Sequence, residues 1–218
     1  ARLRALRPDP CFVPDVTGLI RTGSFDDLAL LSSTGVDWVI EAITEQLDIK
    51  RQLLARVEAH ARPDAILSSN TSGIPLSAIA EGRSPEFRRR WLGTHFFNPP
   101  RYLRLVELIP TPETDPAVLA RMADFIDHRL GKGVVVSRDT PGFIANRIGI
   151  FGAVRLLEVV ASGEFTIEEI DTLTGALIGR PKSATFRTLD MAGLDILSAV
   201  AGDLARRLGD EGGAFELP

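Results

Sequence analysis

The sequence predicts an open α/β sheet followed by an all-helical part, on two observations. Before residue 139, short β-rich runs alternate with amphipathic helical segments, which is typical of strands packed against helices. After Asp139 no strand pattern reappears, and Pro141 with Gly142 marks the change. We therefore expect two domains, residues 1–138 with the sheet and residues 139–218 made of helices.

Five short apolar runs bounded by turn residues predict strands. They lie at residues 36–41, 65–69, 92–97, 105–109 and 133–137. Because open sheets of this kind are mainly parallel and bind ligands beyond their carboxyl edge, we expect polar residues near the strand ends to carry the chemistry.

Helical periodicity fills the segments around these strands. The stretch Ala1–Arg7 is typical of the end of a helix, and Glu45–Ala61 has an apolar face. Asp115 before Pro116 is an N-cap with proline at the first helical position, and Gly131 ends that helix. The buried stripe of this helix is expected at Leu119, Met122, Phe125, Ile126 and Leu130.

The helical part begins with a long helix over residues 143–162. Thr166 with Glu169 three residues later is a capping box that opens the next helix. A last helix covers residues 190–208 and is expected to break near Gly193.

Composition narrows the function classes. The chain has 44% hydrophobic and 25% charged residues, which is ordinary for a globular protein, and its net charge of -4 argues against a nucleic-acid partner. The single cysteine, Cys11, excludes an internal disulfide framework and fits a reducing compartment. No apolar run reaches the ~18 residues of a membrane helix, so we expect a cytoplasmic protein.

His95 is the one histidine on a predicted strand, and Glu107 lies on the next strand. A base oriented by a carboxylate is the usual arrangement for moving a proton from a hydroxyl at neutral pH. From the pattern alone the alternative stays open, namely a core histidine and a charge at the sheet edge. His60 and His128 lie on amphipathic helices and are expected at the surface, and no spacing indicates a metal site.

Ser72 and Asn146 also admit two interpretations. Ser72 closes a Ser-Asn-Thr-Ser run after a strand, and Asn146 lies early in the long helix. Each is either a hydrogen-bonding group of a site or simply a cap or surface residue.

Four segments together resemble the L-3-hydroxyacyl-CoA dehydrogenases, in the order and spacing of that family. They are Ser69–Ser72 (SNTS), Gly93–Pro99 (GTHFFNP), Leu105–Glu107 (LVE) and Asp139–Arg147 (DTPGFIANR). The resemblance runs from Asp37 to Leu208. The motif sequences are most similar to those of bacterial members of the fatty-acid oxidation type.

The resemblance implies an NAD-binding Rossmann-like domain, incomplete at its N-terminus, and a helical domain that completes the substrate cleft and often makes a homodimer. It implies reversible oxidation of an L-3-hydroxyacyl-CoA to a 3-ketoacyl-CoA in fatty-acid β-oxidation, with hydride passing to NAD. His95 would be the general base and Glu107 would orient it, while Ser72 and Asn146 would hold the substrate oxygen. The positions that match contacts to the nicotinamide half of NAD are Glu45, Lys50, Ser72 and Asn98.

The chain departs from the family by lacking the glycine-rich G-x-G-x-x-G turn that binds the pyrophosphate. We expect an N-terminal segment that the sequence does not report, and a genuine fragment is the alternative. Two further hypotheses stay open: a dehydrogenase of a non-CoA hydroxy acid on the same scaffold, and a non-catalytic dimerisation module.

Overall fold

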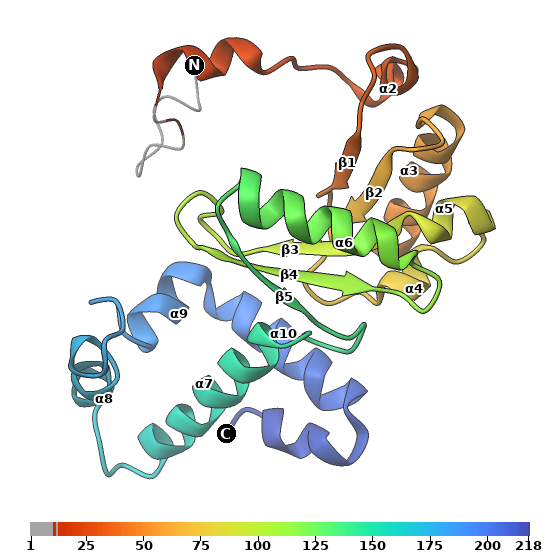
Figure 1. Ribbon diagram of the computed structural model, residues 1–218. Helices are drawn as coiled ribbons and strands as arrows, with labels where there is room; N and C mark the ends of the chain where they lie inside the picture. Colours follow the sequence, from red (N-terminus) through yellow and green to blue (C-terminus); the bar gives the residue numbers. More distant parts are fainter. Residues whose placement is uncertain (1–10, 12) are drawn as a thin grey trace. The chain divides into compact units, whose positions relative to one another are not determined.

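The structure is a computed structural model that describes residue 11 and residues 13–218 (Figure 1). The expected helix end at Ala1–Arg7 lies outside these residues. The described chain divides into an α/β unit, which extends to Val136, and a helical unit formed by Ser137–Pro218. The short segment Ser72–Pro75 belongs to the helical unit, although it lies between two elements of the α/β unit. Nothing in the sequence pattern predicts this assignment.

The α/β unit contains one five-stranded sheet with the order β1-β2-β3-β4-β5. All five predicted strands are confirmed, and their ends move by at most two residues. They are β1 (Trp38–Glu41), β2 (Ile66–Ser69), β3 (Trp91–Phe96), β4 (Leu105–Pro110) and β5 (Gly133–Val136).

The sheet is mainly parallel, as expected, but β4 and β5 run opposite to the first three strands. The first three strands are parallel, β4 is antiparallel to β3, and β5 is parallel to β4. The connection Phe97–Arg104 explains the reversal, because a parallel neighbour needs a crossover of about a dozen residues or more. As a result, Glu107 lies in the middle of β4 and directly opposite His95.

Helices flank this sheet. The predicted helix at residues 45–61 is α3 (Leu47–His60), and the predicted N-cap of α6 (Pro116–Asp124) is confirmed, since Asp115 Oδ1 accepts from Ala117 N at 2.8 Å. Several short helices had no periodicity long enough to predict them. They are η1 (Pro14–Leu19), η2 (Phe25–Asp27), α2 (Leu30–Ser33), α4 (Leu76–Ile79) and α5 (Pro85–Arg89).

The stripe predicted for α6 is only partly correct. Met122 and Ile126 are buried, whereas Phe125 and Leu130 are 39% and 42% exposed. A π-helical turn, η3 (Phe125–Arg129), follows α6 and changes the 3.6-residue phase on which the prediction relied. The end of the helix at Gly131 is confirmed by its left-handed φ of 64°.

The two faces of the sheet carry different residues because side chains alternate along each strand. On one face Ile66, Leu92 and Val106 pack with Met122 and Ile126, and α6 lies across the front of the strands (Figure 1). The opposite face carries Trp91, whose Nε1 donates to Leu76 O of α4 at 2.9 Å. By register, Glu41, Ser69, His95 and Glu107 all lie on this second face.

The helical unit contains only helices among its described residues, as predicted. The capping box is confirmed, with Glu169 N donating to Thr166 Oγ1 at 3.2 Å and Thr166 N to Glu169 Oε2 at 2.8 Å. Gly193, with φ 104°, separates the helix Phe186–Ala192 from the helix Leu194–Arg207, as expected. The elements are α7 (Ala145–Ala161), α8 (Ile167–Leu173), η4 (Ala176–Ile178), α9 (Phe186–Ala192), α10 (Leu194–Arg207) and η5 (Gly209–Phe215).

Candidate active site

His95 and Glu107 form a buried pair in the middle of the sheet. They are register partners on β3 and β4, and His95 Nδ1 lies 2.7 Å from Glu107 Oε2. Their side chains are 5% and 1% exposed. The two strands are therefore neighbours, and the side chains of His95 and Glu107 are in contact.

The carboxylate determines which ring nitrogen of His95 can act as a base. If Glu107 is ionised, its carboxylate only accepts hydrogen bonds, and the hydrogen bond then requires the N–H of His95 to be at Nδ1. In the neutral imidazole Nε2 is then the nitrogen with a lone pair. The edge of the ring packs against Phe97, with centroids 4.7 Å apart, which restricts its rotation. The two contacts thus hold the imidazole in one orientation, and its role as a base stays a prediction.

Of the residues matched to nicotinamide contacts, Glu45 and Asn98 are exposed in the α/β unit. Lys50 differs, because it is 1% exposed and its Nζ contacts Glu41 Oε1 at 2.8 Å and Glu45 Oε2 at 3.2 Å. Glu45 and Asn98 are therefore accessible from solvent, whereas Lys50 is covered and contacts Glu45. The role of all three in binding stays a prediction.

Ser72 and Asn146 meet within the helical unit. Ser72 is exposed, and Asn146 Nδ2 donates to Ser72 O at 3.3 Å. The segment is held a second time by Arg207, which donates to Gly73 O at 2.7 Å. Gly142 and Phe143, both with left-handed φ, precede α7, in which Asn146 is the second residue.

Sequence reasoning assigned no role to several polar residues that hydrogen-bond within the sheet or at its strand ends. Asn70 Oδ1 accepts from Phe96 N at 3.0 Å, which extends the contact of β2 and β3 beyond the last paired residue. Glu41 and Ser69 are buried and bonded to each other. Two signals were present in the sequence: Glu41 and Ser69 are polar residues inside predicted buried strands, and Ser69 and Asn70 lie in the SNTS segment that carries the resemblance.

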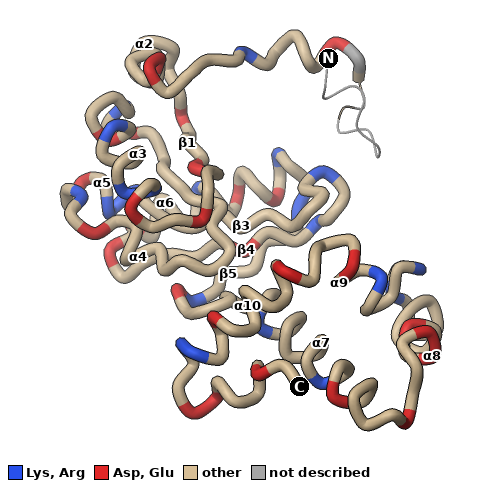
Figure 2. Tube along the Cα trace, turned by 180° about the vertical axis from the view of Figure 1, so that it is seen from behind, with Lys and Arg blue, Asp and Glu red and all other residues tan. Residues whose placement is uncertain are grey.

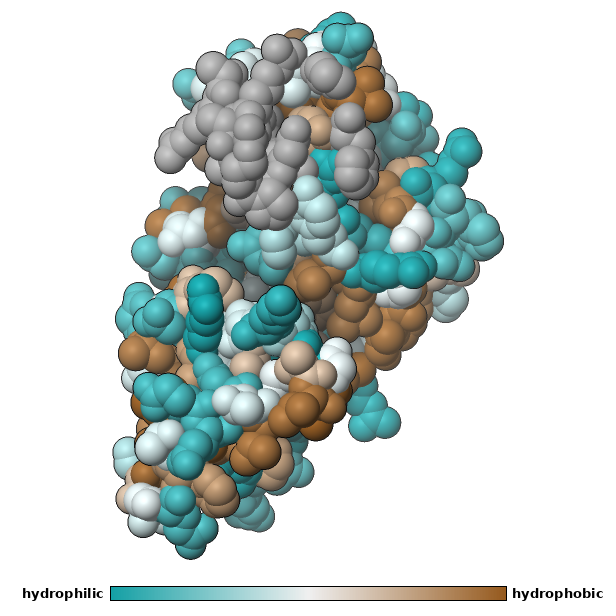
Figure 3. Space-filling view, turned by 90° about the vertical axis from the view of Figure 1, so that its left-hand side faces the viewer, coloured by the Kyte–Doolittle hydropathy of each residue, from teal (hydrophilic) through white to brown (hydrophobic). Residues whose placement is uncertain are grey.

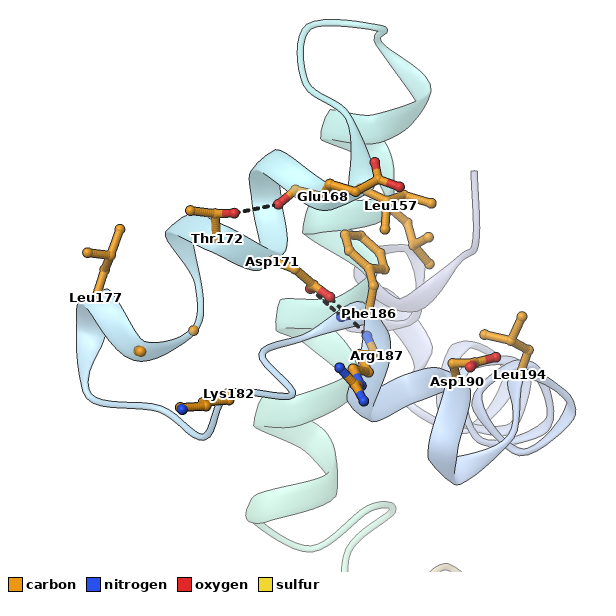
Figure 4. Close-up of a pocket in the computed structure, with 13 residues that line it drawn as sticks. Leu157, Glu168, Asp171, Thr172, Leu177, Lys182, Phe186, Arg187, Asp190 and Leu194 are labelled. Carbon is orange, nitrogen blue, oxygen red and sulfur yellow. Dashed lines mark hydrogen bonds between the residues drawn. The ribbon is translucent and has the colours of Figure 1, made fainter.

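The helical unit contains an open hollow of about 860 Å³ between α8 and α9 (Figure 4). Leu157, Phe186 and Leu194 line its apolar side, while Lys182 and Arg187 are charged lining residues. Asp171 points across it and accepts from three backbone N–H groups at the start of α9, those of Thr185, Phe186 and Arg187, at 3.1, 2.7 and 3.0 Å. Asp171 thereby caps α9 from a neighbouring helix.

Charges of both signs are interspersed along the trace (Figure 2). Within the described part of the chain, no group of three or more His, Cys, Asp or Glu residues is arranged to hold a metal ion. No helix in the same residues is long and apolar enough to cross a membrane.

Two family models cover nearly the whole chain. Residues 16–140 match the NAD binding domain of 3-hydroxyacyl-CoA dehydrogenase, and residues 142–217 match its C-terminal domain. The chain belongs to the 3-hydroxyacyl-CoA dehydrogenase family. The cofactor of the matched domain is NAD, in agreement with the prediction from the motifs.

Relatives of the dehydrogenase family support the same assignment. A probable 3-hydroxyacyl-CoA dehydrogenase of Deinococcus radiodurans is 52% identical over 91% of this chain and 57% of its own length. A Rickettsia felis protein named "Putative fatty acid oxidation complex trifunctional enzyme" is 37% identical over 94% of this chain and 28% of its own length. The chain thus spans about half or less of these relatives.

A solved structure shares the fold. The (S)-3-hydroxybutyryl-CoA dehydrogenase PaaH1 of Ralstonia eutropha superposes with a TM-score of 0.77 and 32% identity, covering 88% of this chain and 64% of that chain. Both the α/β fold and the helical C-terminal domain predicted from the sequence are therefore confirmed at the level of the family.

Proposed function

We propose that this protein catalyses the NAD-dependent oxidation of an L-3-hydroxyacyl-CoA to the 3-ketoacyl-CoA, with His95 as the general base and Glu107 as its orienting carboxylate. The observation that carries the proposal is the buried contact of 2.7 Å between His95 Nδ1 and Glu107 Oε2. A general base needs a fixed orientation and a counter-charge for the proton that it takes up, and this pair has both.

The reaction asks three things of the protein's own residues. His95 Nε2 accepts the proton of the 3-hydroxyl group, and the Glu107 carboxylate stabilises the resulting imidazolium. Ser72 and Asn146 supply a hydroxyl and an amide donor for the substrate oxygen, where charge develops during the reaction. NAD, when bound, accepts the hydride.

The residues matched to the nicotinamide half of NAD fit that group in two ways. Glu45, whose side chain is 46% exposed, and the exposed Asn98 present polar atoms to a ligand. Lys50 Nζ holds Glu45 from the buried side at 3.2 Å, so its contribution is to orient Glu45. We place the reaction in fatty-acid β-oxidation, which the name of the Rickettsia felis relative supports.

The test is a reaction run in the reverse direction with the full-length polypeptide. Acetoacetyl-CoA is added with NADH, and the loss of NADH absorbance is followed. We expect turnover by the wild-type protein and a loss of about 10²–10⁴-fold in kcat for His95→Gln, which is the usual contribution of a general base. The matched control is His128→Gln, because His128 is 70% exposed on the π-helical turn η3.

Two outcomes would contradict the proposal. If a folded wild-type protein does not oxidise NADH in the presence of acetoacetyl-CoA, the proposed activity is wrong. Turnover of the free 3-keto acid at an equal or higher kcat/KM would move the substrate to the class of non-CoA hydroxy acids.

We also propose that the protein forms a homodimer through the helical unit. Large apolar side chains are exposed there, including Leu177 at 72%, Met191 at 67% and Ile178 at 63%. In the space-filling view, apolar side chains reach the surface between polar ones (Figure 3). An exposed apolar surface of this kind is typical of an interface.

A further inference from the structure

Glu41 is a buried carboxylate at the C-terminal end of β1 and is 4% exposed. It accepts hydrogen bonds from three separate stretches of chain. Lys50 Nζ donates to Oε1 at 2.8 Å and to Oε2 at 3.0 Å, Ile43 N donates to Oε1 at 2.7 Å, and Ser69 Oγ donates to Oε2 at 2.5 Å. Each of the two carboxylate oxygens thus accepts two hydrogen bonds. The donors lie in the turn after β1, in α3 and in β2.

These contacts continue into a closed network around two turns. Ser69 Oγ accepts from Thr71 N at 3.1 Å. Lys50 Nζ contacts Glu45 Oε2 at 3.2 Å, and Glu45 Oε1 accepts from Thr71 Oγ1. The turn after β1, which carries Glu45, is therefore linked to the turn after β2, which leads into Ser72.

The buried ion pair within this network needs a reason beyond stability. Glu41 and Lys50 side chains are each 1% exposed, and the desolvation of two charges commonly equals or exceeds their mutual attraction. Well-packed apolar residues would serve a purely structural role equally well. The charges do something that apolar residues cannot, because their hydrogen bonds fix the directions of two polar turns.

We propose that Glu41 is a positioning residue of the dehydrogenase. Through Lys50 and Ser69 it holds Glu45 and Thr71, and so fixes the two turns that present residues to the cofactor and substrate. The proposal rests on the function proposed above, since it assigns these turns to NADH binding. Lys50 acts by the same route, through its contacts with Glu41 and Glu45.

The sharpest test uses two adjacent serines of β2. Ser68 and Ser69 are each 1% exposed, but they lie on opposite faces of the sheet. Ser69 bonds to Glu41, whereas Ser68 accepts from Trp38 Nε1 and Thr94 Oγ1, each at 2.9 Å. Ser69→Ala and Ser68→Ala therefore remove the same group from the same strand at the same burial, and only one of them touches the network.

The readouts are the melting temperature, the Kd of NADH by fluorescence titration, and kcat/KM with acetoacetyl-CoA. We expect Ser69→Ala to raise the Kd of NADH and lower kcat/KM by about 10-fold, within the range that small displacements in an active site produce. Ser68→Ala should lower the melting temperature by a similar amount and leave both binding and turnover within about twofold of wild type. Equal effects of the two variants on NADH binding would overturn the proposal.

A double-mutant cycle tests the route through Lys50. Glu41→Gln and Lys50→Met each leave a buried partner without its counter-charge, whereas the double variant removes both charges. If Glu41 acts through Lys50, the losses in kcat/KM are not additive, and the double variant is no worse than Glu41→Gln alone. Additive losses would overturn this route.

Failure of the function and failure of the positioning role can be told apart. A wild-type protein that binds NADH but does not turn over acetoacetyl-CoA contradicts the proposed reaction, and the Ser68 and Ser69 comparison of Kd still decides the role of Glu41. A folded wild-type protein that binds no NADH overturns both proposals.

Discussion

In the α/β unit the charged side chains of Glu41, Lys50, His95 and Glu107 are buried, whereas the buried polar residues of the helical unit, Ser137 and Thr185, carry no charge. The same contrast holds for hydroxyl groups, since most of the buried polar residues lie before Val136. A buried charge must be satisfied inside its own unit, because water cannot reach it. The buried charges thus lie in the unit to which the chemistry is assigned. Large apolar side chains are exposed in both units, as Leu19 at 82% and Leu177 at 72% show, so association through the helical unit stays a proposal.

The largest effect that tests this comparison is expected from Glu107→Gln. The amide oxygen of glutamine still accepts from His95 Nδ1, so the ring keeps its orientation, but the charge that stabilises the imidazolium is lost. We expect kcat for the reduction of acetoacetyl-CoA to fall by about 10²–10³-fold with little change in melting temperature. Activity within threefold of wild type would show that the buried pair is structural.

A smaller effect is expected from Leu177→Glu in the helical unit. Leu177 is 72% exposed, and a carboxylate there would be buried without a partner in a dimer interface. We expect the dissociation constant of the dimer to rise by about 30-fold or more, measured by sedimentation equilibrium. The control is Leu30→Glu in α2 of the α/β unit, where leucine is 54% exposed. Equal weakening by both variants, or a wild-type monomer, would contradict the assignment of association to the helical unit.

The smallest effect is expected on stability, from the partly exposed ion pair of Glu58 and Arg83 in the α/β unit. It is a comparison for the fully buried pairs of the same unit. Glu58 accepts from Ser84 N at 2.9 Å and from Arg83 Nη1 at 3.0 Å. Burial alone would raise the pKa of Glu58, but the hydrogen bonds of Ser84 and the charge of Arg83 outweigh it and lower the pKa below its usual range. The folded state therefore gives up this proton at lower pH than the unfolded state does.

The pH dependence of this contribution follows from that direction. The stabilisation is present above the ordinary glutamate pKa of about 4.5 and is lost as the pH falls through the lowered pKa of the folded state. We expect Glu58→Gln to reduce the free energy of unfolding by less than about 1 kcal/mol at pH 7, because solvent screens the pair. Denaturant titrations at pH 7 and pH 3 measure this free energy of unfolding for both proteins. A difference between Glu58→Gln and wild type that is larger at pH 3 than at pH 7 would contradict the prediction.

Patterns between near neighbours in the sequence were enough to predict most of the elements. The five strands, the cap at Asp115, the capping box at Thr166 and the break at Gly193 depend on residues within a few positions of each other. Motif order was enough to identify the family, since the matching segments keep their spacing along the chain. The same local rules failed at Phe125 and Leu130, where a π-helical turn shifts the phase.

The site itself depended on contacts between residues far apart in the chain. His95 and Glu107 were candidates from the sequence, but only the antiparallel pairing of β3 and β4 places them directly opposite each other. Lys50 was matched to a nicotinamide contact from the motifs, but only the structure shows that its side chain is buried against Glu41. Whether a polar residue is buried, and which partner satisfies it, is decided by how strands and helices pack. Element boundaries and family membership could therefore be predicted from the sequence, whereas the partners of each polar side chain became known only from the tertiary structure.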